Sequence, residues 1–166
     1  DALPAYLKAI ESNPNYVDAH LARAFVELER GHFDVGWDEY EWRWKSGQIF
    51  PRGLPVQEWN GEDLTGKSIL LYGEQGLGDA LQFIRYATLI KGLGAKEVLV
   101  EVRPQIVRLA RTVHGVDEVI ALGDNIPARI NYCAPMMSCP RILKTTVETI
   151  PATIPYFSYP EERARY

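Results

Sequence analysis

The chain has 166 residues, of which 46% are hydrophobic, so it can bury the core of one ordinary domain or of two small ones. Its 22 acidic and 18 basic residues give a net charge of −4, which is the wrong sign for wrapping a polyanion. Apolar runs such as residues 69–72 are strand-sized, far shorter than the roughly 18 residues of a membrane-spanning helix. We therefore expect a globular cytoplasmic protein with no nucleic-acid partner and no membrane span.

The cysteines and histidines show no metal-binding pattern. Cys133 and Cys139 fit neither a paired metal motif nor a disulfide framework. His20, His32 and His114 lie in different predicted elements, with no HExxH pairing. We expect structural thiols and ordinary packed or surface histidines, without a metal ion.

Residues 1–45 show the periodicity of a helical repeat. Small and aromatic residues recur at the offsets of a tetratricopeptide-type unit, whose period is about 34 residues. The matching positions are Ala2, Tyr6, Ala9 and Pro14 in one copy, Gly36, Tyr40 and Arg43 in the next, and Ala24, Gly31 and Phe33 between them. Small residues are needed where helices touch closely, and aromatic residues fill the gaps between helix pairs. The sequence predicts one and a half repeats, and we expect more before Asp1 in the parent protein.

Two positions depart from this repeat, because Arg23 and Glu27 stand where an apolar residue and an aromatic residue are usual. An aromatic cluster follows near the end of the last helix, and it comprises Trp37, Tyr40, Trp42 and Trp44. At this spacing we expect the cluster to seal a core or a domain junction, because aromatic side chains bury large apolar areas.

Residues 46–67 are interrupted by several glycines and prolines, which excludes a helix or a long strand and predicts a connector. Trp59 and Leu64 are apolar anchors within it. We therefore expect an ordered linker that lies along the next domain.

Residues 68–166 alternate between short apolar runs and helical periodicity. Strands are predicted at 68–72, 97–102 and 116–122, with a short fourth strand at 130–133. Helices are predicted at 79–92 and from Pro104 to Gly115. Such alternation implies a parallel sheet with right-handed crossovers. The predicted fold class is α/β, with repeat-type helices followed by a doubly wound parallel sheet.

The loop at residues 73–79, with the sequence GEQGLGD, is the best candidate for a ligand site. It joins the first strand of the sheet to a helix, and ligands bind at the carboxyl ends of parallel strands. Its glycines permit backbone conformations closed to other residues, and free N–H groups at the helix start suit an anion or a sugar hydroxyl. The spacing is neither GxGxxG nor a P-loop, which disfavours dinucleotides and nucleoside triphosphates. The candidate ligand-binding residues are Glu74, Gln75, Gly76 and Gly78.

The polar residues of this region have alternative interpretations. Asp79 is either a helix N-cap that accepts a backbone N–H or a general base that takes a proton from a ligand hydroxyl. Glu74 and Gln75 either hydrogen-bond a ligand or satisfy the backbone of the turn. Glu101 is left outside the site, because an exposed acid at a strand end is the commoner case.

Three segments together resemble a known family: the aromatic run at residues 36–44, the WNGE sequence at 59–62 and the EQGLGD sequence at 74–79. They look like bacterial tetratricopeptide proteins with a glycosyltransferase-like domain related to the heptosyltransferases of lipopolysaccharide synthesis (glycosyltransferase family 9). The resemblance covers nearly the whole chain. Cys133 and Cys139 stand where this family is expected to carry histidine and leucine.

The resemblance implies the N-terminal, acceptor-side half of a two-domain GT-B transferase. Gly78-Asp79 matches the family's Gly-Asp pair, which implies that Asp79 is the catalytic base for the acceptor hydroxyl. No metal or other cofactor is implied. The nucleotide-sugar donor would bind a C-terminal domain beyond Tyr166, so the fragment alone should be inactive, and the repeats would present a protein or glycan acceptor. The alternatives are a non-enzymatic tetratricopeptide interaction scaffold and an independent nucleotide-binding Rossmann-like domain.

Overall fold

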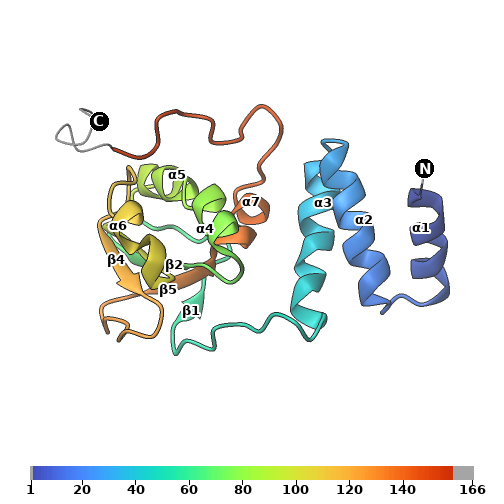
Figure 1. Cartoon of the computed structure of the whole chain (residues 1–166), viewed down its shortest axis with the longest axis horizontal. Coiled ribbons are helices and arrows are strands. Elements are labelled where there is room, and N and C mark those ends of the chain that lie inside the picture. Colours follow the sequence, from blue (N-terminus) through green and yellow to red (C-terminus); the bar gives the residue numbers. More distant parts are fainter. Residues whose placement is uncertain (1, 159–166) are drawn as a thin grey trace. The chain divides into compact units, whose positions relative to one another are not determined.

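A computed structural model describes residues 2–158, so Asp1 and residues 159–166, at the outer ends of the predicted ranges 1–45 and 68–166, lie outside the described residues. The chain forms two compact units (Figure 1). Within the described residues, the helical unit comprises residues 2–52 and Pro140–Ile150, and the α/β unit comprises Gly53–Cys139 and residues 151–158. The helical unit thus includes a segment from the second half of the sequence, while the boundaries at residues 45 and 67 stay predictions.

Three successive helices make up most of the helical unit: α1 (Leu3–Ser12), α2 (Val17–Glu29) and α3 (Phe33–Tyr40), which the 3-10 turn η1 (Glu41–Lys45) extends. Pro4 lies in the first turn of α1, where its missing N–H removes no helical hydrogen bond. Gly31 has a left-handed φ of +80°, which allows the sharp turn between α2 and α3. Gly36 permits close packing, because a Cβ there would lie 2.7 Å from Cγ of Leu28. The tetratricopeptide assignment of these helices stays a prediction.

Charged side chains fill part of the interface between α2 and α3. A carboxylate oxygen of Glu39 lies 2.5 Å from Nδ1 of His20, and the other accepts a hydrogen bond from Arg23 at 2.8 Å. Arg23 also lies 3.8 Å from the carboxylate of Glu27. The ring of His20 stacks on Trp42 at a centroid distance of 3.7 Å. Arg23 and Glu27, the two departures from the repeat pattern, therefore belong to one network.

The remaining members of the aromatic cluster also pack within the helical unit. Trp37 meets Tyr40 edge to face, with ring centroids 6.0 Å apart. The guanidinium of Arg43, which is 2% exposed, lies 4.9 Å from the ring of Tyr40 and 4.4 Å from the ring of Trp44. These contacts agree with a packing role for the cluster.

The α/β unit contains a parallel sheet of five strands among the described residues. The strands are β1 (Gln57–Glu58), β2 (Ser68–Tyr72), β3 (Glu97–Val102), β4 (Glu118–Ala121) and β5 (Tyr132–Pro135), in the spatial order β1-β5-β2-β3-β4. The predicted mixed α/β fold with a parallel sheet is therefore confirmed. β1 was not predicted, and it adds a short edge strand from within the range 46–67, where Trp59 and Leu64 are also buried.

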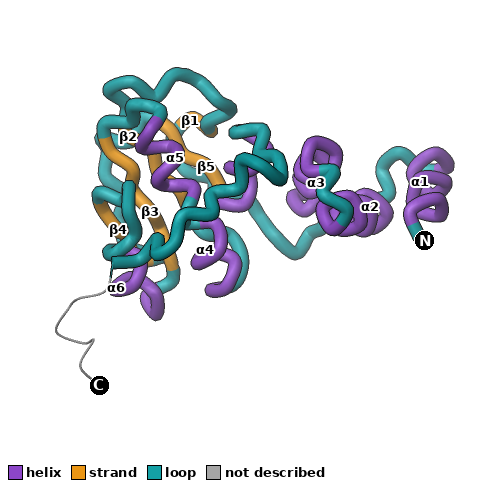
Figure 2. Tube along the Cα trace, turned by 90° about the horizontal axis from the view of Figure 1, so that it is seen from above, coloured by secondary structure: helices purple, strands orange, loops and turns teal. Residues whose placement is uncertain are grey.

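Short helices connect β2 to β3 and β3 to β4 (Figure 2). They are α4 (Leu77–Phe83) and α5 (Tyr86–Gly92) in the first connection, and the 3-10 turn η2 (Pro104–Ile106) with α6 (Val107–Ala110) in the second. Ile84 and Ile90 are fully buried, as the helical periodicity predicts. The predicted single helix at 79–92 is wrong in one respect, because a turn at Ile84 and Arg85 divides it in two.

Alternate strand residues point away from these helices, because successive side chains of a strand face opposite sides of the sheet. Leu70, Leu99 and Cys133 on that second side form a buried cluster with Ile130, and Ile126 packs against it. The connection from β4 back to β5 therefore crosses the sheet on this second side, and it does so without a helix between residues 122 and 131.

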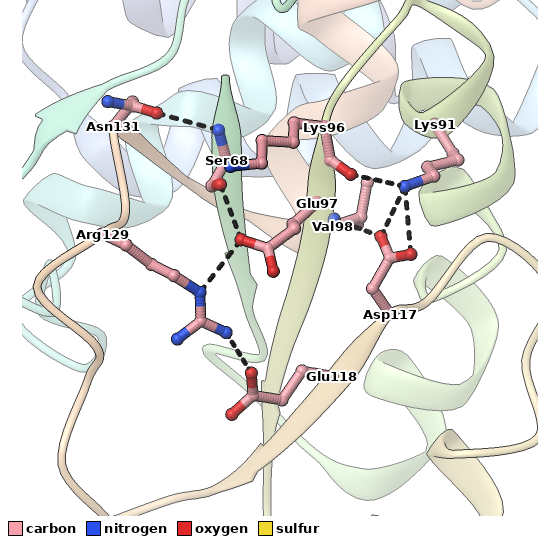
Figure 3. Close-up of polar contacts among 9 residues, drawn as sticks. All are labelled: Ser68, Lys91, Lys96, Glu97, Val98, Asp117, Glu118, Arg129 and Asn131. Atoms are coloured by element: carbon pink, nitrogen blue, oxygen red, sulfur yellow. Dashed lines mark hydrogen bonds and ion pairs between the residues drawn. The ribbon is translucent and has the colours of Figure 1, made fainter. Parts of the chain in front are cut away.

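Polar contacts join the amino ends of β2, β3 and β4 (Figure 3). Glu97 accepts hydrogen bonds from Oγ of Ser68 and Nε of Arg129, both at 2.9 Å, and Arg129 also pairs with Glu118. The amide of Ser68 donates to Oδ1 of Asn131 at 2.9 Å. These contacts fix the strands at the end of the sheet opposite the candidate loop.

No helix in residues 2–158 has both the length and the apolar character needed to span a bilayer. Within the same residues, no cluster of three or more His, Cys, Asp and Glu side chains is arranged to hold a metal ion. α7 (Cys139–Ile142) begins at the last residue of the α/β unit's first segment and leads into the helical unit.

Candidate functional site

The candidate site lies where the strand order of the sheet reverses. From β2 the chain proceeds to β3 and β4 on one side, and then returns to place β5 on the other side of β2. Tyr72 at the end of β2 pairs with Pro135 at the end of β5, so the segments that follow both strands leave the sheet side by side. Such a switch point is where open parallel sheets form a ligand-binding crevice.

The two segments at the switch point are joined by Glu74. Its Oε1 accepts a hydrogen bond of 3.3 Å from the amide of Met137, in the 3-10 turn η3 (Met136–Ser138) that follows β5. Glu74 and Gln75 are both half-buried. The contact shows that Glu74 connects two loops. Its role is therefore not limited to satisfying the backbone of its own turn.

Asp79 lies in the first turn of α4, at the third helical position, and the N-cap is Gly76. The expectation that Asp79 is itself the N-cap is therefore wrong in position. Its Oδ2 nevertheless accepts a hydrogen bond of 2.9 Å from the amide of Gly76, which satisfies an N-terminal donor from the far side of the turn. Its Oδ1 has no hydrogen-bond partner within residues 2–158. One oxygen thus stabilises the helix start, and the other stays available to a ligand.

The glycines of the loop do not have the role that their conformational freedom suggests. Positive φ values occur at other glycines, but Gly73, Gly76 and Gly78 have none. Steric space explains Gly76 better, since a Cβ there would lie 3.0 Å from Oδ2 of Asp79. Gly73 approaches Ala80 closely, because its Cβ would lie 3.4 Å from that of Ala80. Gly78 has open space around it.

The surface of the loop offers hydrogen-bond donors beside the carboxylates. Gly76, Leu77 and Gly78 are exposed to solvent. The amides of Leu77 and Gly78 occupy the first helical positions and donate to no group in the described part of the chain. A hydroxyl-bearing ligand therefore finds both donors and a carboxylate acceptor within one turn.

The expectation that Glu101 is an exposed acid at a strand end is wrong. It is 1% exposed, so it is a buried acid and not a solvated strand end. In the sheet it lies opposite Tyr72, and its carbonyl oxygen accepts a hydrogen bond of 3.0 Å from the amide of Gly73. The sequence carried a signal for burial, because Glu101 stands between Val100 and Val102 in an apolar run that follows Glu97. Glu101 therefore supports the base of the loop.

The two cysteines lie in β5 and just after η3, and both are buried free thiols. Burial, followed by the negative charge of Glu58, raises the pKa of Cys133 to about 11. Its Sγ donates to the carbonyl oxygen of Val56 at 3.7 Å, and that of Cys139 donates to Pro135 at 3.6 Å. Since the thiolate is the nucleophilic form, the raised pKa disfavours a nucleophilic role for Cys133.

The fold and the site define a parallel α/β unit with a loop-lined switch point, combined with a helical unit. Comparison with known proteins shows that the chain is 41% identical over 65 residues to part of protein FlbA of Caulobacter vibrioides. The alignment covers 38% of this chain and 11% of the length of FlbA. No protein-family model matches the chain, and no solved structure matches it with statistical significance.

Proposed function

We propose that this chain is the acceptor-side part of a glycosyltransferase-like protein, in which an α/β unit of GT-B type follows tetratricopeptide-type helices. The observation that carries the proposal is the hydrogen bond between Glu74 and Met137 at the switch point, beside the exposed residues 76–78. A carboxylate, unpaired amides and two adjoining loops suit the many hydroxyl groups of a sugar. The donor nucleotide sugar would bind outside these 166 residues.

In the proposed reaction, Asp79 is the general base. Its Oδ2 is held by the amide of Gly76, so the carboxylate keeps one orientation while Oδ1 takes the proton of the acceptor hydroxyl. The acceptor oxygen then forms a bond to the anomeric carbon of the donor, and the bond from that carbon to the diphosphate breaks. Glu74, Gln75, Gly76 and Gly78 contact the acceptor in this proposal.

The helical unit, in the same proposal, presents a protein or glycan acceptor to the α/β unit in the cytoplasm. This role depends on the repeat-type spacing of Gly36 and Tyr40, which lie in a tightly packed α2–α3 pair. Repeat arrays bind partners through extended surfaces built from such pairs.

A non-enzymatic scaffold is the second candidate, and one observation favours it. The hydrogen bond from the amide of Gly76 gives Asp79 a structural role that needs no substrate. Under this alternative the helical unit binds a protein partner, and the α/β unit serves only to support it.

The proposal is tested first by binding to the 166-residue chain. Backbone NMR spectra are recorded during titration with neutral mono- and disaccharides, and in parallel with a nucleoside diphosphate. Shifts at residues 74–79 and 136–138 with saccharides support the acceptor site. Shifts at the same residues with the nucleotide alone support an independent nucleotide-binding domain. An absence of shifts with either ligand contradicts both binding sites and supports the non-enzymatic scaffold.

The second test is transfer activity of the protein encoded by the complete gene. Asp79→Asn keeps an oxygen that accepts the Gly76 amide and removes only the basic group, so we expect turnover to fall by a factor of at least about 100 at unchanged Tm. Asp124→Asn, at an exposed loop position, is the matched control. Full activity in Asp79→Asn would contradict the assigned base.

A further inference from the structure

A cavity of the α/β unit lies away from the switch point. It has a volume of about 230 Å³ and lies between α5 and the segment at residues 151–156. Arg85, Thr88 and His114 line one side, and Pro151, Thr153 and Tyr156 line the other. It shares no residue with the loop at 73–79, and the proposed function makes no use of it.

The segment that closes this cavity is tied to the helices at several points. The carbonyl oxygen of Pro151 accepts a hydrogen bond of 3.0 Å from Arg85. Tyr156 donates its hydroxyl to the carbonyl of Leu81 at 3.2 Å and accepts the amide of His114 at 3.3 Å through its own carbonyl. Figure 1 shows the segment passing along α5. One wall of the cavity is therefore a segment that is hydrogen-bonded to the rest of the α/β unit.

Among the described residues that line the cavity there is no carboxylate, and the hydroxyls of Thr88 and Tyr156 already donate to backbone carbonyls. The guanidinium of Arg85 lies over the ring of Tyr156, with its central carbon 4.5 Å from the centroid. One terminal nitrogen, Nη1, donates to Pro151, and the other, Nη2, has no partner within residues 2–158. The stack holds the planar fork of the guanidinium in one orientation, which is the arrangement that favours binding of an oxyanion.

Two further donors lie around the same space. The side chain of His114 is exposed, and Thr153 contributes a hydroxyl from the opposite wall. Because Arg85 and His114 lie on one wall and Thr153 on the other, they suit the several oxygens of a phosphate better than the planar pair of a carboxylate. Leu89 and Pro155 add apolar surface for an organic group attached to the phosphate.

The size of the cavity limits the ligand. Pockets for drug-sized ligands measure roughly 300–1,000 Å³, and this one is smaller at about 230 Å³. We propose that the cavity bounded by Arg85, His114 and residues 151–156 binds a small phosphate monoester. A nucleotide sugar exceeds this space, which separates the site from any donor site of the proposed transferase.

The test is calorimetric and NMR titration of the 166-residue chain at constant ionic strength, with phenyl phosphate, inorganic phosphate and benzoate as ligands. We expect phenyl phosphate to bind more tightly than inorganic phosphate, because its ring covers Leu89 and Pro155, and benzoate to bind most weakly. NMR shifts should map to α5, His114 and residues 151–156. Tighter binding of benzoate, or shifts confined to residues 73–79, would overturn the proposal.

Variants make the assignment specific. Arg85→Gln should weaken phenyl phosphate binding at least about tenfold, since a charge-assisted hydrogen bond is lost. Arg85 also supports the segment at 151–156, so His114→Gln is a second variant that changes only an exposed ring, and about threefold weaker binding is expected. Arg108→Gln removes an exposed charge from α6, outside the cavity, and should leave the affinity within about twofold. Equal losses in Arg108→Gln and Arg85→Gln would show non-specific charge attraction and overturn the site.

Discussion

The two units of the chain have differently composed interiors. In the α/β unit, Leu70, Leu99 and Val100 are fully buried in adjacent strands, and apolar contacts make up the centre of the sheet. In the helical unit, the contact between α2 and α3 contains Glu39, Arg23 and buried His20. Apolar burial needs no partner, whereas a buried charge requires one. The stability of the α/β unit therefore depends on filled apolar space, and that of the helical unit depends also on paired polar groups.

The largest expected effect tests the apolar interior. Leu70→Ala in β2 should destabilise the α/β unit by about 3 kcal/mol, because it removes transfer free energy and leaves a cavity. Hydrogen exchange of β2 and β3 amides under native conditions reports this unit separately from α2 and α3. Leu93→Ala, at a position that is 48% exposed, is the control and should change stability by less than about 0.5 kcal/mol. A loss shared equally by both units would show that they unfold together.

The polar interior is tested by Glu39→Gln. The change removes the charge that faces His20 and Arg23, and we expect the helical unit to lose about 2 kcal/mol, since hydrogen bonds to charged groups are lost from a mostly buried site. Hydrogen exchange of the α2 and α3 amides reports this unit, whereas tryptophan fluorescence would also report Trp59 of the α/β unit. Glu29→Gln, at an exposed position of α2, should have little effect. If both variants behave alike, the network contributes nothing specific.

Close packing of α2 and α3 gives a smaller effect. Gly36→Ala places a methyl group 2.7 Å from Cγ of Leu28 and 3.0 Å from its amide nitrogen, so we expect a net loss of about 1 kcal/mol after the gain in helix propensity. Gly92→Ala in α5 has no atom within 4 Å of the added Cβ and should be neutral or slightly stabilising. The denaturation midpoint of Gly36→Ala should therefore fall, while that of Gly92→Ala should stay unchanged or rise slightly. A more stable Gly36→Ala would mean that α2 and α3 accommodate the added methyl group at little cost, which would contradict the close packing at this position.

The smallest effect concerns pH. The hydroxyl of Ser68, and after it the guanidinium of Arg129, hold the pKa of Glu97 below its usual value. A carboxylate whose folded pKa is lowered stabilises the folded state above its usual pKa, and this contribution is lost as the pH falls through the lowered value. Ser68→Ala and Arg129→Gln should each raise the pKa of Glu97 towards its usual value, because each weakens the hydrogen bonding to its carboxylate. Carbon-detected NMR titration of the Glu97 carboxyl measures both shifts, and an unchanged pKa in either variant would contradict the role of that partner.

Much of the fold was predictable because its signals are local. Apolar runs marked β2 and β3, and alternation with helical periodicity predicted a parallel sheet. β1 was missed, since the two exposed residues Gln57 and Glu58 carry no apolar pattern. The division at Ile84 and Arg85 was missed too, because apolar spacing continues across it. The return of residues 140–150 to the helical unit depends on contacts distant in sequence, which no local pattern encodes.

The candidate site was predictable in location but not in contacts. The glycine-containing bend after a buried strand pointed to residues 73–79. The partner of Glu74 is Met137, which lies 63 positions later, so no spacing rule connects them. The sequence indicates that Asp79 is a helix cap or a general base. Its position within the helix could not be predicted, because it depends on the residue at which α4 begins. The burial of Glu101 contradicted its residue type, which usually favours solvent. Membership of the transferase family stays a prediction.

The discontinuous make-up of the helical unit affects how the chain can be divided. The backbone passes from one unit to the other after Arg52, after Cys139 and after Ile150. A single protease cut near residue 52 would leave residues 2–52 held only by non-covalent contacts with residues 140–150, and neither unit corresponds to one uninterrupted stretch of the sequence. Expressing residues 2–52 alone would deprive the helices of Pro140–Ile150, so studies of either half require the other to be synthesised with it.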